Sequence, residues 1–441
     1  MKILSITAQK PHSTGSGTYL TELVKALDEA GHKQAVVAGI YPEDCVQFSS
    51  AVEFFPVFFE NKEKPVTDEK FLSECIGFPV VGMSDSMPYP STKYSEMTDE
   101  MIAEFEEAFI GVIGEAISEL KPDVIICHHL FLLTAMVRKH FPNEKVYGIC
   151  HGSDLRQIAN CPKLAAKVVP QIRKLDRIFA LHDKQADQIF KILNVKNIND
   201  TECLTANDKD SLKDILKGQL SSGYKSSDCN ISVIGSGYNQ ELFNCVGRKE
   251  REAGDRVRVC FAGKVSHAKG AAELLDAVDL LNAEGKLDFE LVIAGGCQED
   301  DIKKRLEHLP NNVAYLGMLS QDELANVYKS CDIFVLPSYY EGLGLVLIEA
   351  MASGLVPIVT NLPGIKDWID ENVVNPNVRY IPMPEMEGID SPTKTGRKEF
   401  IYNLSNILSD TISDIKKCNL SSLPDTSNIS WQKVSEKILN L

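Results

Sequence analysis

Residues 331–360 read Cys331-Asp-Ile-Phe-Val-Leu-Pro-Ser-Tyr-Tyr-Glu-Gly-Leu-Gly-Leu-Val-Leu-Ile-Glu-Ala-Met-Ala-Ser-Gly-Leu-Val-Pro-Ile-Val-Thr360. Within this stretch, residues 333–336 are a short apolar run of strand-forming side chains that ends at a Pro-Ser pair. Residues 345–351 are apolar at helical spacing, and Gly354 closes that segment before a second apolar run. The pattern predicts a strand, a loop, a helix and a second strand.

The loop of this stretch carries glycines and carboxylates in an order that favours anion binding. Glu341, Gly342 and Gly344 fall where the loop enters the helix, so free backbone N–H groups and the positive end of the helix dipole would point outward. Glu349 lies eight residues beyond Glu341, at most about 12 Å along a helix. Two carboxylates at that separation suit two sets of sugar hydroxyls on either side of a diphosphate. The alternative is an ordinary Rossmann-type unit whose acids are a cap and a solvated face.

The segment Glu341-Gly-Leu-Gly-Leu-Val-Leu-Ile-Glu349 resembles the Glu-x7-Glu signature of retaining, nucleotide-sugar-dependent glycosyltransferases with the GT-B fold, the family-four or glycosyl transferases group 1 type. The resemblance implies that Glu341 touches the donor sugar, that Glu349 holds the ribose hydroxyls, and that the glycine loop approaches the diphosphate. It also implies two Rossmann-like, doubly wound α/β domains facing a cleft, with a C-terminal helix that crosses back to the N-domain. In this family the acceptor is thought to attack on the same face of the sugar, while the departing phosphate oxygen takes its proton.

Residues 263–270, Gly-Lys-Val-Ser-His-Ala-Lys-Gly, follow another expected strand and precede a helix. Lys264 and Lys269 would then lie over the carboxyl edge of the sheet, where cations neutralise a diphosphate leaving group. The family usually has Arg at the first position, so Lys264 is a departure that keeps the charge but loses the bidentate fork. Gly295 resembles the loop beside the nucleotide base. The alternatives are two exposed lysines on a capping loop and a plain strand-to-helix turn.

Residues 12–17, His-Ser-Thr-Gly-Ser-Gly, lie between the first expected strand and its helix. Gly15, Ser16 and Gly17 suit a close approach of the backbone to phosphate or sugar, and the segment is similar to the glycine loop that opens the family's N-terminal domain. The third glycine of a dinucleotide-binding fingerprint, near Leu20, is absent. A plain tight turn is the alternative.

Three histidines follow the carboxyl ends of two expected parallel strands, where open α/β sheets bind ligands. His151-Gly152 resembles the family's active-site His-Gly, whose imidazole contacts the donor sugar, and Asp154 is expected to cap the next helix. His128 and His129 either reach the acceptor or are ordinary histidines at a strand end.

The alternation of strands and helices breaks once, near 245–255. We expect an N-terminal, acceptor-side domain over 1–244 with the terminal segment 426–441, and a C-terminal, donor-binding domain over 255–425. Residues 46–98 are expected to be a long loop that shapes the acceptor pocket or a surface excursion, and 196–230 a polar insertion. The expected strands are 2–7, 33–38, 122–127, 145–150, 176–181, 257–262, 289–294, 313–316, 333–336 and 379–381, with one more that begins at 231 before a glycine turn and one that follows Gly354 and ends at Thr360. The expected helices are 18–30, 99–120, 130–141, 162–174, 184–193, one near 209–218, 271–284, 298–308, 321–329, 345–351, 397–417 and 430–438.

Composition excludes several classes of protein. The chain has 441 residues, a formal charge of −16 and no block of Lys or Arg. This negative charge argues against a nucleic-acid partner, because nucleic-acid binding needs a basic surface. The apolar run 124–137 is too short to span a membrane, and the N-terminal apolar run is too short for a signal peptide, so a cytoplasmic protein is expected. Contact with a membrane surface through a basic patch assembled in space stays open. The twelve cysteines include no Cys-x2-Cys pair, which argues against structural zinc.

The first reading is a retaining, metal-independent glycosyltransferase of hexosyltransferase type, which moves a sugar from a nucleotide-diphosphate-sugar donor to an unidentified acceptor without a further cofactor. The alternatives are a nucleotide-sugar epimerase of the same fold and a catalytically silent nucleotide-sugar-binding subunit. The expected catalytic residues are His151, Glu341, Lys264 and Lys269, and the expected donor-binding residues are Gly15, Ser16, Gly17, Gly263, Gly295, Gly342, Leu343, Gly344, Leu345 and Glu349.

Overall fold

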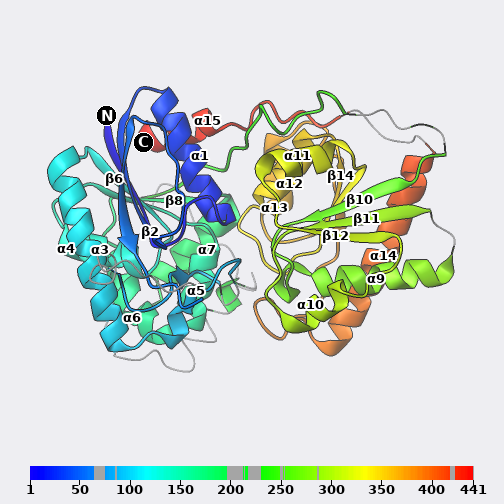
Figure 1. Ribbon diagram of the computed structural model, residues 1–441, viewed down its shortest axis with the longest axis horizontal. Coiled ribbons are helices and arrows are strands. Elements are labelled where there is room, and N and C mark those ends of the chain that lie inside the picture. The colour runs from blue at the N-terminus through cyan, green and yellow to red at the C-terminus, as the bar shows by residue number, and fades with distance from the viewer. Residues whose placement is uncertain are drawn as a thin grey trace. The chain divides into compact units, whose positions relative to one another are not determined.

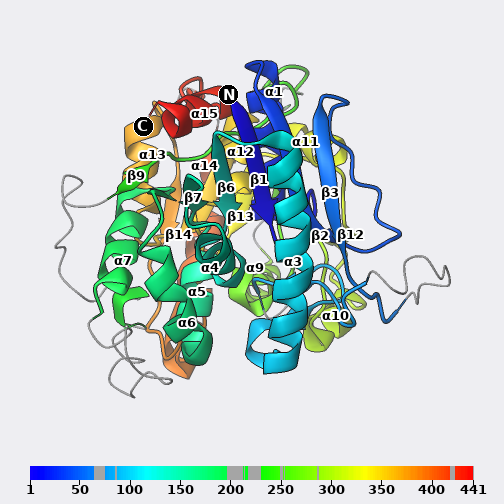
Figure 2. The ribbon, with the colours of Figure 1, turned by 90° about the vertical axis from the view of Figure 1, so that its left-hand side faces the viewer.

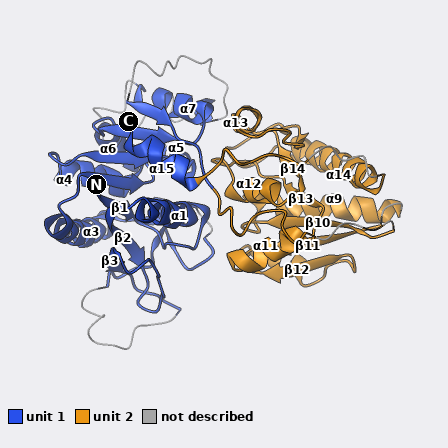
Figure 3. Cartoon of the chain, turned by 90° about the horizontal axis from the view of Figure 1, so that it is seen from above, with its two compact units in different colours: residues 1–237, 431–441 blue, residues 238–430 orange. Residues whose placement is uncertain are grey.

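A computed structural model of the chain describes residues 1–63, 75–84, 87–195, 212, 214–216, 230–248, 252, 254–285, 288–417 and 423–440. The chain divides into two compact units, which Figure 3 shows in different colours. Unit 1 contains Met1–Gly237 and Trp431–Leu441, and unit 2 contains Tyr238–Ser430. Each unit is described by itself.

Unit 1 is built on a seven-stranded sheet in which every strand pairs with its neighbours in parallel (Figure 1). The strand order is β3-β2-β1-β6-β7-β8-β9, so the order reverses between β1 and β6. The central strands are buried on both faces, as their continuous apolar runs predicted. The strands are β1 (Lys2–Thr7), β2 (Lys33–Ile40), β3 (Val52–Phe58), β6 (Val124–His128), β7 (Val146–Ile149), β8 (Arg177–Ala180) and β9 (Ile231–Val233).

The helices of unit 1 cover this sheet. Helix α3 (Asp99–Leu120) packs against β1, β2 and β3, and α15 (Trp431–Leu439) packs against α1 (Gly15–Glu29) (Figure 2). The expectation that the terminal helix returns to the N-terminal domain is therefore matched by this packing. The other elements are β4 (Val81–Gly82), β5 (Thr92–Lys93), η1 (Tyr94–Glu96), α4 (Leu132–His140), α5 (Ser153–Asn160), α6 (Pro162–Ile172) and α7 (Asp183–Leu193).

The expectation of a long loop over 46–98 is wrong in part, because β3 lies within it. The sequence of β3 contains Pro56, which has no backbone N–H to donate to a neighbouring strand. Proline is tolerated in an edge strand, because only one side of that strand is paired. β3 is that edge strand and pairs with β2 from Val52 to Phe58. Most of the expected insertion 196–230 lies outside the described residues. Residues 212 and 214–216, which are described, are helical.

Unit 2 repeats the same plan with six parallel strands in the order β12-β11-β10-β13-β14-β15. The order reverses between β10 and β13. Both units therefore have the doubly wound arrangement that the sequence predicted. The strands are β10 (Val257–Ala262), β11 (Phe289–Ala294), β12 (Val313–Gly317), β13 (Ile333–Leu336), β14 (Val356–Thr360) and β15 (Arg379–Ile381).

The helices of unit 2 begin in the loops that follow these strands. α9 (Ala271–Glu284) packs against the long α14 (Lys394–Lys416). Helix α13 (Ile365–Asn372) was not among the expected helices. No helix within the described part of the chain combines the length and apolar character needed to cross a membrane. The remaining elements are η4 (His267–Lys269), α10 (Asp300–Leu306), α11 (Gln321–Lys329) and α12 (Leu345–Ala352).

The chain passes from one unit to the other at 237–238 and again at 430–431, whereas the sequence placed these borders near 244–255 and 425–426. Within unit 1, a Cβ on Gly237 would lie 2.5 Å from the backbone nitrogen of Trp431, so the two border segments are in close contact. Within unit 2, the hydroxyls of Tyr238 and Thr426 lie 2.8 Å apart. The ring of Phe243 packs against that of Tyr328, with centroids 5.8 Å apart, which ties the first border segment to the body of unit 2.

Candidate functional site

The residues expected to bind the donor gather where the strand order of unit 2 reverses. β10 and β13 are neighbours, with Cys260 opposite Phe334, and the loops after them run from Gly263 to Gly270 and from Pro337 to Gly344. In open parallel sheets, ligands bind at the carboxyl ends of the strands at this reversal point.

An ion pair joins these two loops. Lys269 Nζ lies 2.6 Å from Glu341 Oε1, and Ser338 Oγ donates to the same oxygen at 2.8 Å. The side chains of Lys269 and Glu341 are 26% and 15% exposed, so the pair is accessible to a ligand without being fully solvated. The two residues that the sequence assigned to the diphosphate and the sugar are therefore in direct contact. Ser338, which sequence reasoning missed, orients the carboxylate.

Glycine is required where the neighbouring loops approach each other most closely. Gly295 has φ of 134°, and a Cβ there would lie 1.7 Å from the carbonyl oxygen of Gly263. Gly270 has φ of 66°, and its Cβ would lie 2.2 Å from the carbonyl oxygen of Pro337. L-residues rarely adopt such φ values, and real Cβ atoms do not approach backbone this closely. These glycines let the loops after β10, β11 and β13 pack backbone to backbone.

Helix α12 begins at the same edge. Gly344 precedes it with φ of 73°, and no described side chain caps its first turn. The first N–H groups of a helix have no acceptor within it. The N–H of Leu347 donates to the carbonyl oxygen of Gly344 at 3.0 Å, and those of Leu345 and Val346 before it are the ones that an anion can use. Leu343 is buried and anchors the loop that contains Gly342.

Glu349 lies on α12 but is only 6% exposed. Burial, together with the charge of this carboxylate, raises the pKa of Tyr328. The alternative in which Glu349 belongs to a solvated face is therefore wrong. Lys264 is half-buried at the end of β10.

In unit 1, three histidines gather at the carboxyl ends of β6 and β7. His128 Nδ1 and His151 Nε2 are 3.1 Å apart, and their rings are stacked with centroids 5.2 Å apart. The ring of His129 lies 4.8 Å from that of His151, and His129 has φ of 75°, which turns the chain sharply after β6. Tyr19 meets His151 edge-on at 4.9 Å, and its hydroxyl donates to the carbonyl oxygen of Gly235.

Burial keeps this cluster neutral. Desolvation lowers the pKa of His151 to about 3 and those of His128 and His129 well below their ordinary value. Within the described part of the chain, neither ring nitrogen of His129 has a hydrogen-bond partner, and neither does Nε2 of His128. Buried polar atoms of this kind are normally satisfied by protein, water or ligand.

Two local expectations for unit 1 are corrected. Asp154 does not cap a helix through its side chain; it is fully buried and accepts from the backbone N–H of Leu130 at 2.7 Å, which joins the loops after β6 and β7. Helix α1 begins at Gly15 rather than at residue 18, because Thr14 caps it by accepting from the N–H of Gly17.

The segment 15–17 therefore forms the first helical turn instead of a free loop. The hydroxyl of Ser16 donates to Gln9 Oε1 at 3.1 Å. A Cβ on Gly17 would lie 2.8 Å from the carbonyl oxygen of Lys10, so this turn is packed against the end of β1.

Residues 247–380 match a family model described as glycosyl transferases group 1. An uncharacterized glycosyltransferase of Methanocaldococcus jannaschii is 25% identical to this chain over 287 residues, which are 62% of this chain and 65% of that protein. A D-inositol 3-phosphate glycosyltransferase of Corynebacterium jeikeium is 27% identical over 205 residues, 43% of this chain and 48% of that protein. The chain thus spans about half to two thirds of the length of these curated relatives.

Among solved structures, sucrose-phosphate synthase from Thermosynechococcus elongatus resembles the chain with a TM-score of 0.64 at 15% identity, over 99% of this chain and 97% of that chain. This likeness concerns the fold, and the expected GT-B fold with two Rossmann-like domains is confirmed. The segment matched by the family model contains Lys264, Lys269, Glu341 and Glu349, whereas His151 lies outside it.

Proposed function

We propose that this chain, in which residues 247–380 form a glycosyl transferases group 1 domain, is a glycosyltransferase that moves a sugar from a nucleotide-sugar donor to an acceptor hydroxyl. The observation that carries the proposal is the contact of Lys269 with Glu341 where the strand order of unit 2 reverses, beside the uncapped start of α12. A cation, a carboxylate and free backbone N–H groups together match the chemistry of a sugar diphosphate.

Unit 2 binds the donor in this proposal. The diphosphate lies at the first turn of α12, near Leu345, and its charge is balanced by Lys264 and Lys269. When the bond to the sugar breaks, negative charge grows on the leaving phosphate, and cations held at that place stabilise the transition state more than the ground state. Glu341 then accepts hydrogen bonds from sugar hydroxyls, and Glu349 from the ribose.

His151 of unit 1 contacts the donor sugar in this proposal as a neutral imidazole. Because burial lowers its pKa to about 3, it provides a hydrogen bond instead of a positive charge near pH 7. The positive charge that the reaction needs is supplied by the lysines of unit 2, so the transfer itself is proposed to require no metal. The configuration of the sugar is retained, with the departing phosphate oxygen accepting the proton of the acceptor.

The first experiment measures thermal stabilisation by UDP, GDP and ADP and by their sugar conjugates, with and without EDTA. A ligand that binds only the folded protein raises the melting temperature. One base is expected to give a selective shift, and the matching sugar nucleotide is then incubated with candidate acceptors. Product analysis distinguishes transfer from epimerisation, which alters the donor without a second substrate.

Variants test the site itself. Lys269→Ala and Glu341→Gln are each expected to lower kcat about 100-fold or more, the usual effect of removing one group that stabilises transition-state charge. Lys398→Ala, an exposed lysine of α14, is the matched control and should retain activity. Wild-type rates in both site variants would refute the site assignment, and an absence of any nucleotide shift or transfer would refute the proposed activity.

A further inference from the structure

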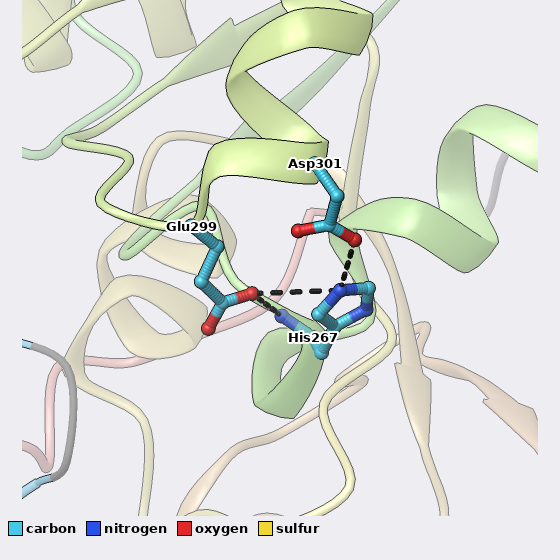
Figure 4. Close-up of side chains that lie close together, drawn as sticks. All are labelled: His267, Glu299 and Asp301. Carbon is cyan, nitrogen blue, oxygen red and sulfur yellow. Dashed lines mark hydrogen bonds and ion pairs between the residues drawn. The ribbon is translucent and has the colours of Figure 1, made fainter.

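A histidine and two carboxylates meet on two adjacent loops of unit 2, as Figure 4 shows. His267 belongs to η4, in the loop after β10, while Glu299 immediately precedes α10 and Asp301 lies in its first turn. Their ligand atoms lie within 4.8 Å of one another, and no other group of three His, Cys, Asp or Glu side chains in the described ranges meets this condition. None of the three was singled out from the sequence.

The distances suit a shared ligand. His267 Nε2 lies 2.7 Å from Asp301 Oδ2 and 3.8 Å from Glu299 Oε2. Two atoms bound to one tetrahedral metal ion at bonds of 2.0–2.1 Å are about 3.3–3.4 Å apart. The two distances from the imidazole nitrogen lie on either side of that value by about half an ångström, and all three ligand atoms lie within 4.8 Å of one another. Rotation of the side chains, of which His267 and Asp301 are 50% and 68% exposed, would bring the three atoms into coordination.

Backbone contacts hold the two loops in this register. Val265 N donates to the carbonyl oxygen of Gly296 at 2.9 Å, and Val265 and Cys297 form a parallel bridge. The backbone N–H of His267 donates to Glu299 Oε2 at 2.8 Å, which fixes the carboxylate beside the imidazole. A site whose ligands are already positioned loses little conformational freedom when an ion binds.

We propose that His267, Glu299 and Asp301 bind a divalent transition-metal ion, with Zn²⁺ as the reference ion. One imidazole nitrogen and two carboxylate oxygens form a donor set that suits Zn²⁺, Co²⁺ and Mn²⁺. A neutral imidazole and two carboxylates carry two negative charges, which a divalent cation balances. Three protein ligands leave at least one coordination position open to water or to an oxygen of a bound ligand.

This site goes beyond the proposed sugar transfer and does not depend on it. The ion ties the loop after β10, which contains Lys264 and Lys269, to the loop after β11, which contains Gly295. Metal occupancy is therefore expected to change the affinity of unit 2 for nucleotides, and by linkage a nucleotide changes the affinity for the metal by the same factor. The metal test below uses no substrate, so its outcome and that of the transferase proposal are separate.

The experiment is titration of the chelator-treated, full-length protein with ZnCl₂ by calorimetry under reducing conditions, and with CoCl₂ by visible absorption. Wild type is expected to bind one equivalent with an increase in melting temperature, and the Co²⁺ bands report imidazole and carboxylate ligation. His267→Ala is expected to lower the affinity of this equivalent about 100-fold or more. Asp301→Asn, which preserves shape, is expected to weaken it as well.

The matched control is His140→Ala, because His140 Nε2 lies 2.6 Å from Glu106 Oε1 in a pair without a third ligand atom. This variant should bind Zn²⁺ as wild type does. Circular dichroism establishes that each variant is folded. The proposal is overturned if the wild-type protein does not bind one equivalent of Zn²⁺, or if His267→Ala and Asp301→Asn bind Zn²⁺ as tightly as wild type does. It is also overturned if His140→Ala no longer binds that equivalent of Zn²⁺.

Discussion

Replacing Gly295 with alanine is expected to destabilise unit 2 by about 3 kcal/mol. The new Cβ would lie 1.7 Å from the carbonyl oxygen of Gly263, whereas even 3.0 Å is a distance that real Cβ atoms essentially never show. Backbone on both sides of this contact belongs to loops that leave adjacent strands, so no flexible side chain can move away. A φ of 134° adds conformational strain for any L-residue.

Two terms make up this magnitude. A residue in a φ region reserved for glycine costs about 1–3 kcal/mol, and overpacking of a tight contact costs about 1–3 kcal/mol. For a unit of the size of Tyr238–Ser430, each kcal/mol corresponds to a shift of about 2–4 °C in melting temperature. The melting temperature of unit 2 is therefore expected to fall by about 6–12 °C.

The assay is thermal and urea unfolding of Gly295→Ala, followed by nucleotide titration of the folded variant. The control is Gly111→Ala, since Gly111 is exposed within α3 and a Cβ there meets no atom within 4 Å. That change should stabilise its helix by about 0.5–1 kcal/mol. A Gly295→Ala protein that melts within about 2 °C of wild type, with unchanged nucleotide affinity, would show that the loops are not packed as described.

Three further predictions follow from contacts within single units. Arg397→Ala should destabilise unit 2 by about 2 kcal/mol, because it removes the guanidinium that lies 2.6 Å from the carboxylate of Glu273, a side chain that is only 3% exposed. Urea unfolding measures this loss, and a change below about 0.5 kcal/mol would contradict the prediction. His128→Phe keeps the stacked ring but removes the hydrogen bond to His151, so kcat should fall about tenfold with a smaller change in KM for the donor; an unchanged kcat would contradict a positioning role for His128. Acidification from pH 7 to 5 should destabilise unit 1, because the pKa of buried His129 is far lower in the folded than in the unfolded state. Below the ordinary histidine pKa of about 6.5, His129 takes up a proton when unit 1 unfolds, which lowers the free energy of unfolding by up to about 2 kcal/mol at pH 5. His129→Phe should reduce this pH dependence, and the same dependence of unfolding free energy on pH in the variant and in wild type would refute the prediction.

Elements that are buried on both sides could be predicted nearly to the residue. β10, β11 and β13 have the expected bounds because their sequences are mostly apolar, as expected for parallel strands covered on two faces. The charged exceptions are Arg258 and Glu290, the half-buried second residues of β10 and β11. β3 was missed because an edge strand needs neither continuous burial nor every N–H group, so Pro56 is compatible with it. The start of α1 was missed because Thr14, its cap, lies in a Ser- and Gly-rich segment that also suits a turn.

Contacts between distant residues could not be predicted in the same way. Lys269 and Glu341 are 72 residues apart, and the sequence assigned each to a ligand without indicating that they pair. His267 and Asp301 are 34 residues apart on separate loops, so no short metal-binding motif identifies them. Their proximity depends on the register between two loops, and that register is set by close backbone contacts such as the one between Gly263 and Gly295.

The position of Trp431 has a consequence for the order in which the protein folds during synthesis. Unit 2 is continuous from Tyr238 to Ser430, whereas unit 1 combines Met1–Gly237 with Trp431–Leu441, which follow unit 2 in the chain. On the ribosome, the unit that begins later can therefore finish folding first, while its predecessor waits with the binding surface of α1 for α15 uncovered. During that interval α1 lacks its packing against α15, and the Tyr19 ring lacks its edge-on contact with Trp431 at 4.7 Å.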